Sequence, residues 1–199
     1  MKTLTCPNCG AEYNPAKYKC DYCGSFVIMS DEKQFNVPQN IISEISESDN
    51  AGIYVYGSLL GKGEIPLRLG LANYYTSKFF ASGGKLFLTK TNLYFTSHTL
   101  LQKKIDLCIN LLDIKNVTHD RNLLISDHIS VHTDEKQYTF VVYGGKEWIS
   151  MMNSAREDFS PAQHERDYTA ELMRLKKLLD NGIITEEEFT IKKRMLLGI

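Results

Sequence analysis

The sequence predicts a multidomain α+β protein with three small parts: a cysteine-rich module, an antiparallel β-barrel capped by one helix, and a C-terminal helical hairpin. Three observations lead to this prediction. Two Cys-x-x-Cys pairs lie within the first 24 residues, short alternating apolar runs fill residues 68–143, and apolar residues recur every three or four positions after residue 167. A chain of 199 residues accommodates one large domain or several small ones.

Composition and charge exclude several classes of protein. The 23 basic and 24 acidic side chains give a net charge of −1, whereas proteins that hold nucleic acid without sequence preference are usually basic. No run of about 18 apolar residues occurs, and no hydrophobic stretch follows the first residues, so we expect neither a membrane-spanning helix nor a secretory signal. We therefore expect a cytoplasmic protein, with peripheral contact to a membrane as one option.

Local composition indicates two linkers between the parts. Residues 25–50 carry one Lys and five acidic residues, together with Pro38 and repeated Ser and Asn, which is typical of a linker. Ile41, Ile42 and Ile45 would allow a short helix there to dock on a neighbour. A second joint is expected at Pro161. The predicted parts are a cysteine module at 1–28, a linker at 29–50, the barrel at 51–157, a linker at 158–166 and the hairpin at 167–199.

The cysteine module contains the most specific motif. The motifs are Cys6-Pro-Asn-Cys9-Gly10 and Cys20-Asp-Tyr-Cys23-Gly24, with ten residues between Cys9 and Cys20. Two such tight turns supply four thiolates, the ligand set of a closed tetrahedral zinc site. A redox dithiol needs only one such pair beside a helix, and four unligated thiols are the other alternative. We predict one structural zinc ion, held by Cys6, Cys9, Cys20 and Cys23.

This stretch resembles a short zinc ribbon. A segment this small buries too little apolar surface to fold by itself, so metal binding must supply most of its folding energy. Zinc ribbons bind nucleic acid or protein in many settings. Here only Lys2, Lys17 and Lys19 are basic, which favours protein contact or a purely structural role over nucleic-acid binding.

The middle segment alternates like a series of short strands. Lys85–Thr89 and Leu93–Thr96 form a predicted hairpin, preceded by a turn at Gly83-Gly84. Further predicted strands are 105–111, 129–133 and 138–143, and residues 147–156 have the apolar spacing of a helix. Trp148 of that helix is expected to pack against one end of the barrel.

Residues 84–95, GKLFLTKTNLYF, resemble the GRAM signature of glycine, alternating leucines, threonine, leucine and phenylalanine. Residues 111–117, 138–140 and Trp148 match later parts of the family, so the resemblance covers about 51–157. It implies a pleckstrin-homology-like (PH-like) fold that binds phosphoinositides, other anionic lipids or proteins. Phe87 stands where a phosphoinositide binder often has arginine, which argues against that ligand. The candidate lipid- or partner-binding residues are Lys78, Phe79, Phe80, Lys85, Lys103 and Lys104.

No feature of the sequence indicates catalysis. None of the five histidines lies in a paired metal-ligand motif, and no Gly-x-Ser-x-Gly occurs. We therefore expect a protein that is not an enzyme; an unrecognised active site would need a deep polar pocket in the barrel.

The C-terminal segment has the pattern of two short helices. Gly182 ends the first helix, and Thr185 with Glu188 forms a capping box at the start of the second. The segment closely resembles the SHOCT family, the short C-terminal domain of bacterial and phage proteins, which implies an interaction or oligomerisation module. The predicted contact residues are Leu172, Leu175, Leu179, Ile184, Phe189, Leu196 and Leu197.

Two classes of function remain open from the sequence. The first is a non-enzymatic adaptor that self-associates through its hairpin and binds a protein or membrane surface through its PH-like domain. The alternative is a zinc-ribbon regulator that binds nucleic acid. The hairpin could instead pack on its own barrel or on a different protein.

Overall fold

The computed structural model describes residues 4–48, 51–61, 63–77, 80–98, 104–121, 127–158 and 172–197. The chain forms two compact units, Met1–Arg156 and Glu157–Ile199. The larger unit contains every strand of the described residues, and the smaller one is helical.

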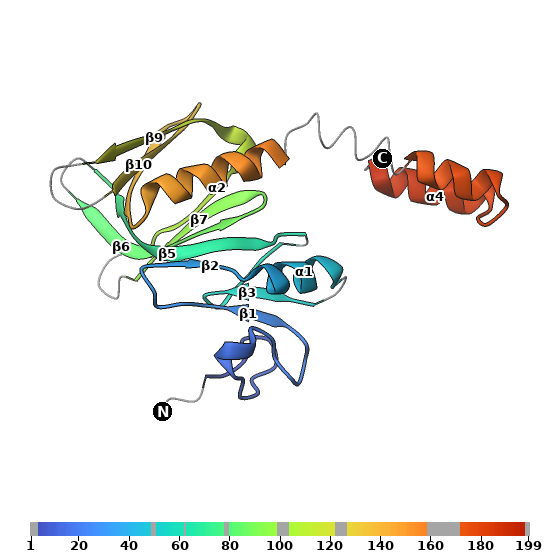
Figure 1. The fold of residues 1–199 in the computed structure, drawn as a ribbon, viewed down its shortest axis with the longest axis horizontal. Coiled ribbons are helices and arrows are strands. Elements are labelled where there is room, and N and C mark those ends of the chain that lie inside the picture. The colour runs from blue at the N-terminus through green and yellow to red at the C-terminus, as the bar shows by residue number, and fades with distance from the viewer. Residues whose placement is uncertain are drawn as a thin grey trace. The chain divides into compact units, whose positions relative to one another are not determined.

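An eight-stranded antiparallel sheet organises the larger unit (Figure 1). Its order is β8-β7-β6-β5-β11-β10-β9, with β2 pairing with the first half of β5. The strands are β2 (Gln34–Asn36), β5 (Pro66–Tyr75), β6 (Ala81–Thr89), β7 (Asn92–Ser97), β8 (Asp106–Asn110), β9 (Ile114–Arg121), β10 (Asp127–Thr133) and β11 (Gln137–Val142).

The sheet of the described residues is open and does not close into the predicted β-barrel. Within the described residues, β8 and β9 end the strand order and do not pair with each other. A short 3₁₀ helix, η2 (Leu111–Asp113), joins them, and the Asn110 side chain accepts a hydrogen bond from the Leu112 N–H at 2.9 Å. This corner redirects the chain without the two-residue turn that would pair β8 with β9 in a hairpin.

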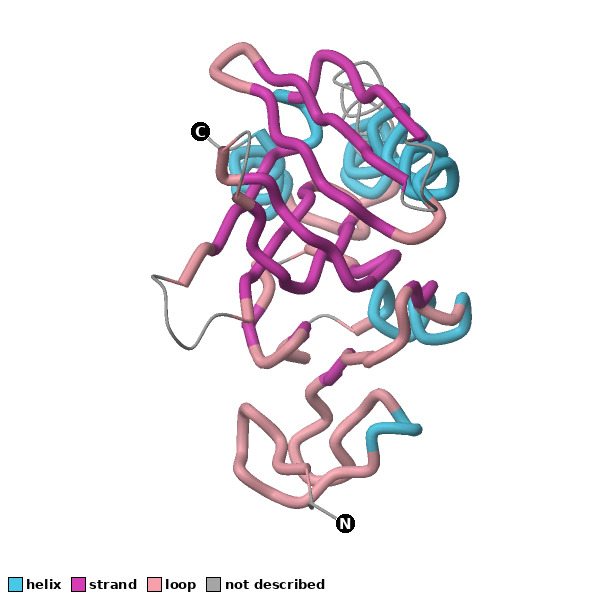
Figure 2. Tube along the Cα trace, turned by 90° about the vertical axis from the view of Figure 1, so that its left-hand side faces the viewer, coloured by secondary structure: helices cyan, strands magenta, loops and turns pink. Residues whose placement is uncertain are grey.

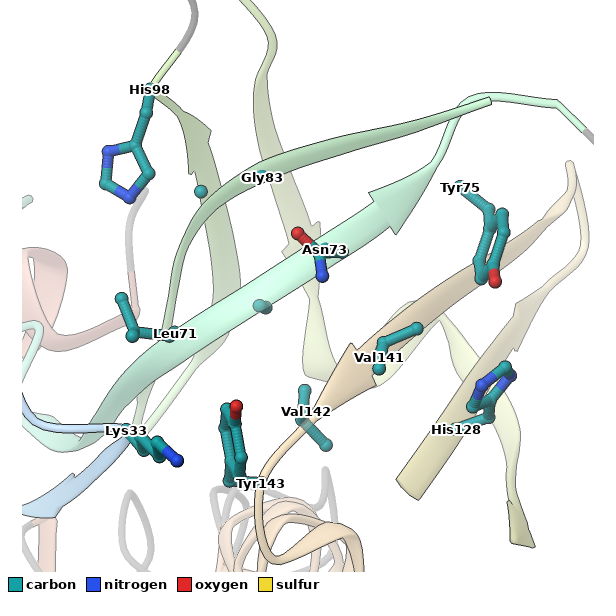
Figure 3. Close-up of a pocket in the computed structure, with 12 residues that line it drawn as sticks. Lys33, Leu71, Asn73, Tyr75, Gly83, His98, His128, Val141, Val142 and Tyr143 are labelled. Carbon is teal, nitrogen blue, oxygen red and sulfur yellow. The ribbon is translucent and has the colours of Figure 1, made fainter. Parts of the chain in front are cut away.

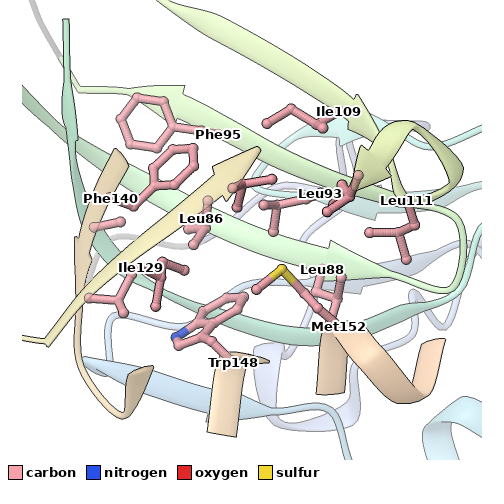
Figure 4. Close-up of a cluster of buried hydrophobic side chains, with 14 of the residues drawn as sticks. Leu86, Leu88, Leu93, Phe95, Ile109, Leu111, Ile129, Phe140, Trp148 and Met152 are labelled. Atoms are coloured by element: carbon pink, nitrogen blue, oxygen red, sulfur yellow. The ribbon is translucent and has the colours of Figure 1, made fainter. Parts of the chain in front are cut away.

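One face of the sheet packs on helix α2 (Gly145–Asp158). Trp148, Met152 and Ala155 recur at spacings of four and three, and all three are buried. Figure 4 shows Trp148 and Met152 lying over Leu86 and Leu88 of β6. The sequence correctly predicted both this helix and the burial of Trp148.

The β5–β6 hairpin differs from its prediction. Gly83 and Gly84 lie inside β6 rather than in a turn, and β5 and β6 pair as far as Tyr75 and Ala81. Gly84 faces the buried core, where a side chain would collide with the Phe95 ring. The glycines therefore reflect close packing within a strand.

The other face of the sheet is partly covered by a second layer, the described residues of 26–65 apart from strand β2, which we call the cover. Figure 2 shows these residues as short elements joined by loops, beside the strands of the main sheet. The cover contains β1 (Phe26–Ile28), α1 (Gln39–Glu47), β3 (Ile53–Val55) and β4 (Ser58–Leu59), of which the three strands form a small sheet.

Residues 29–50, predicted as a linker, are therefore largely ordered structure within the cover. Ile41 and Ile45 of α1 are buried one helical turn apart, in a cluster that includes Leu69 and Phe87 of the main sheet. The composition suggested a linker because the polar residues dominate the count, whereas two isoleucines on one face suffice to dock a nine-residue helix.

Two buried cations of the main sheet reach into residues 30–36. Arg68 of β5 donates to Asn36 Oδ1 at 2.6 Å and to Gln34 Oε1 at 2.7 Å, and burial lowers its pKa. Lys85 of β6 donates to the Ser30 carbonyl at 2.9 Å and to Asp31 at 3.1 Å. Since a buried charge is costly without partners, these oxygens are required for the burial of both cations.

Replacing Lys85 by Met tests this anchorage. Met keeps the apolar stem but leaves the Ser30 carbonyl without its ammonium donor, so we expect the free energy of unfolding to fall by about 1–3 kcal/mol. Denaturant unfolding followed by circular dichroism measures the change. Lys90→Met, at an exposed lysine of the next turn, is the matched control and should cost less than about 0.5 kcal/mol. Equal stability of the two variants would contradict the anchorage.

Candidate functional site

The four predicted zinc ligands meet in space. Their Sγ atoms all lie within 4.8 Å of one another, with Cys6 Sγ 3.6 Å from Cys23 Sγ and Cys9 Sγ 3.7 Å from Cys20 Sγ. Zn–S bonds of about 2.3 Å place the sulfurs of a tetrahedral site about 3.8 Å apart. The cluster therefore has the dimensions and the soft ligands to hold one metal ion.

Two equivalent turns build the cluster. Gly10 and Gly24 each follow the second cysteine of a pair and adopt φ of +74° and +73°, which favours glycine. Their amides donate to the carbonyls of Cys6 and Cys20 at 2.9 and 3.0 Å. The two copies of Cys-x-x-Cys-Gly thus adopt the same backbone conformation, and each turn presents two sulfurs on one side.

Ser25 favours the thiolate form on one side of the cluster. The Ser25 hydroxyl, 3.4 Å from Cys23 Sγ, and the Ser25 amide lower the pKa of Cys23 to about 6. Asn8 Nδ2 donates to the same hydroxyl at 3.0 Å, and Tyr54 of β3 donates to Asn8 Oδ1 at 3.2 Å. This chain of hydrogen bonds links the ligand turns to the cover, a connection with no signal in the sequence.

Strand β1 is shared by the cysteine module and the cover. Val27 packs with Cys6, Tyr13 and Cys20, whereas Phe26 and Ile28 point into the cluster that covers the main sheet. Successive side chains of a strand point to opposite faces. One three-residue strand therefore contributes side chains both to the apolar cluster of the cysteine module and to the cluster beneath the cover, so the cysteine module packs continuously with the rest of the larger unit.

Of the described residues predicted to bind lipid or partner, Lys85 does not lie on the exposed surface. Lys85 is 8% exposed and binds the cover, and Phe87 is buried beneath the cover. Lys104 is exposed and pairs with Asp106 at 3.1 Å. Phe80 is 71% exposed. Lys78, Phe79 and Lys103 lie outside the described residues.

The smaller unit is a helical hairpin. Its first helix covers 172–180, and its second is α4 (Glu186–Leu197). Gly182 adopts φ of +66° between them. The Thr185 amide donates to Glu188 Oε2 at 2.9 Å, and the Glu188 amide donates to Thr185 Oγ1 at 3.2 Å, which confirms the predicted capping box.

The predicted oligomerisation residues are unequally buried. Leu175 is buried within the unit, and Leu172, Leu179, Ile184 and Phe189 are half-buried. The side chains of Leu196 and Leu197 lie outside the described residues. Met173 and Ile183, which the sequence pattern did not single out, are 65% and 66% exposed. Their exposure depends on how the two helices rotate against each other, which spacing alone does not give.

Comparison with protein families supports both of the larger predicted parts. Residues 60–152 match the model of the GRAM domain, and residues 170–197 match that of SHOCT, the short C-terminal domain. The GRAM match, the antiparallel sheet and the C-terminal helix α2 together indicate a PH-like fold. No curated protein matches the chain.

Several solved PH domains are similar at low identity. The Vps36 N-terminal PH domain has 16% identity and a TM-score of 0.42, with 51% of this chain and 86% of that chain covered. For the N-terminal PH domain of human ARAP2 the identity is 17%, the TM-score 0.38, and the coverage 47% and 81%. The Slm1 PH domain in complex with phosphoserine has 21% identity and a TM-score of 0.32, with 44% of this chain and 89% of that chain covered. The assignment rests on the family match and the topology.

None of the described helices is both long and apolar enough to cross a membrane.

Replacing Cys20 by Ser should loosen β1 as well as the ligand turns, because Val27 packs directly on the cluster. We expect amide hydrogen exchange to become at least about tenfold faster in residues 4–28 and in β3, with β10 and β11 unchanged. Exchange measured by mass spectrometry checks this. Cys108→Ser, at an exposed cysteine outside the cluster, is the control. If the amides of β1 were as well protected in Cys20→Ser as in the wild type, the proposed packing of β1 against both clusters would be wrong.

The capping box gives a prediction for the smaller unit. Thr185→Ala should cost about 1 kcal/mol of local helix stability, measured as faster amide exchange in 186–197. In Thr190→Ala, the lost hydroxyl only bonds to the Glu186 carbonyl, so the amides of 186–197 should stay as protected as in the wild type.

The Thr185 amide and hydroxyl lower the pKa of Glu188. The box is therefore intact above the carboxyl's ordinary pKa and weakens as pH falls through the lowered value.

Proposed function

We propose that the protein is a non-enzymatic cytoplasmic adaptor. It holds a structural zinc ion in its cysteine cluster, self-associates through the C-terminal hairpin, and binds a protein or membrane surface through its PH-like domain. The observation that carries the proposal is the hairpin: a well-capped helical pair that leaves Met173 and Ile183 exposed.

Zinc fits the cysteine cluster better than other common metals. Four thiolates are soft ligands, and sulfur pairs 3.6 and 3.7 Å apart match a tetrahedral site. With all four positions filled by protein, no coordination site stays open for water, so the ion would stabilise the two turns rather than take part in a reaction. The pKa of Cys23 is lowered to about 6, which favours its ligand form at neutral pH, whereas the pKa of Cys9 is raised to about 12, so binding of the ion would have to displace a proton there.

Self-association is supported by the apolar surface of the hairpin. Two short helices bury little area, and Leu175 is the one buried apolar side chain among the described side chains of this unit. Large exposed apolar side chains on so small a unit are typical of an interface. A two-fold pair would place the same residues on both copies.

For the PH-like domain, a protein partner fits better than an anionic membrane. Lys85 is bound to Ser30 and Asp31, and Lys104 is paired with Asp106. Each lysine near an anionic surface contributes at most about 1 kcal/mol, so the burial of Lys85 removes one such contribution and the pairing of Lys104 with Asp106 reduces another. Phe80, 71% exposed, remains available to an apolar contact.

Metal analysis tests the zinc site. We expect one zinc ion per chain in protein purified without chelator, measured by plasma mass spectrometry, and less than about 0.1 in Cys20→Ser. Cys108→Ser should keep one ion. Zinc-free wild type with four rapidly alkylated thiols would rule out the site.

Light scattering tests self-association. The full chain should have about twice the monomer mass of 22.7 kDa. The double variant Met173→Glu, Ile183→Glu should run as a monomer, because the interface would bury two unpaired carboxylates. Both positions are exposed in the single chain, so the hairpin should still fold.

The matched control is Leu59→Glu, the same change at a side chain that is 61% exposed on the larger unit. It should leave the mass of the assembly unchanged. A monomeric wild type at micromolar concentration would overturn the self-association part of the proposal, and the hairpin would then be assigned to a different protein.

A further inference from the structure

A hollow of about 730 Å³ lies on the part of the main sheet that the cover leaves open. Its floor is a row of residues paired across four strands: Gly83 of β6, Asn73 of β5, Val141 of β11 and His128 of β10. Side chains paired across antiparallel strands share one face. Since Ala72 and Tyr74 point into the core on the opposite face, this row faces outward.

The hollow exists partly because Gly83 contributes no side chain. A Cβ atom there would lie only 3.2 Å from Asn73 Oδ1, so any larger residue would press on the amide in the middle of the floor. His98 lies beside this gap, because its backbone N–H donates to the Gly83 carbonyl at 2.9 Å. The second glycine of the pair packs on Phe95 in the core, so the two glycines have different roles.

Aromatic rings stand at both ends of the hollow (Figure 3). At one end, Lys33 Nζ lies 4.6 Å from the centre of the Tyr143 ring. At the other end, the Tyr75 and His128 rings are 5.9 Å apart. Strand β5 holds the backbone of Lys33 in place, because the Leu71 amide donates a hydrogen bond to the Lys33 carbonyl at 3.1 Å.

The charge of the lining is one-sided. Lys33 and the two imidazoles of His98 and His128 line the hollow, and none of the described residues that line it is acidic. Among the described residues, Lys33 forms no ion pair with a carboxylate. A concave site with one ammonium group and imidazoles but no carboxylate attracts a compact anion.

We propose that this hollow binds a small phosphate monoester that carries a flat ring, the chemistry of a nucleoside monophosphate. Its volume falls within the range of about 300–1,000 Å³ that is usual for small-molecule sites. The Lys33 ammonium, the Asn73 amide and the His98 ring supply donors for a dianion. The Tyr75 and Tyr143 rings offer faces for a base. One lysine suits a monophosphate better than a triphosphate, which carries more charge.

The test is isothermal titration of full-length protein with AMP, GMP, CMP and UMP, with adenosine as the uncharged probe. We expect at least one nucleotide to bind with a Kd below 1 mM and adenosine to bind at least about tenfold more weakly. Lys33→Gln should weaken nucleotide binding about five- to tenfold, since it removes the charge from an exposed side chain.

Lys136→Gln is the matched control, because Lys136 also lies over a tyrosine ring, 4.4 Å from the centre of Tyr138, and does not line the hollow. It should bind as the wild type does. Amide NMR signals of Asn73, Gly83 and His98 should shift on titration. No binding by any nucleotide, equal losses in both lysine variants, or shifts confined to other residues would overturn the proposal.

A second arm separates this ligand from a lipid headgroup. Inositol 1-phosphate and vesicles containing phosphatidylinositol 4-phosphate carry the same phosphate chemistry without a flat ring. We expect at least about tenfold weaker binding of these probes than of the best nucleotide. The reverse preference would overturn the assignment to a ring-bearing monophosphate. Light scattering of the same samples reports self-association separately, so the two proposals can fail independently.

Discussion

The larger unit depends on the burial of two cations on its main sheet. Arg68 and Lys85 are both under 10% exposed, and burying either charge without partners would cost several kcal/mol. The oxygens that accept hydrogen bonds from them come from residues 30–36, so β5 and β6 depend on a segment that precedes them in the chain. The Arg68 guanidinium also lies 5.0 Å from the centre of the Trp148 ring and thus links strand β2 to helix α2.

Patterns that are complete within a few residues could be read from the sequence. The two Cys-x-x-Cys-Gly repeats, the capping box at Thr185 and the apolar spacing of α2 each specify their own local structure, and each occurs as predicted. Five strands of the main sheet, β6, β7, β8, β10 and β11, were also predicted, because alternation is a local signal. The strands before residue 80 were not predicted one by one. Strand β9, with Lys115, Asn116 and Thr118 among its residues, lacks strong alternation and was missed.

The remaining features depend on contacts between distant residues. Lys85 looks like a surface lysine in a strand, and only the approach of Ser30, 55 residues earlier, makes it a buried anchor. The hollow needs four strands in register before Gly83, Asn73, Val141 and His128 become neighbours. Tertiary pairing of this kind leaves no periodicity in a single sequence, so the candidate site could be predicted only at its cysteines.

The cover also determines where a folded fragment of this protein can begin. The GRAM match begins at residue 60, but a fragment that starts there would expose Leu69 and Phe87 and would leave both buried cations without their oxygen partners. The smallest piece that keeps those contacts must begin before Phe26, and Val27 extends that requirement to the cysteine turns. The sequence-family boundary and the boundary of the folding unit therefore differ by at least 34 residues, and exchanging this domain between proteins would require moving the N-terminal module with it.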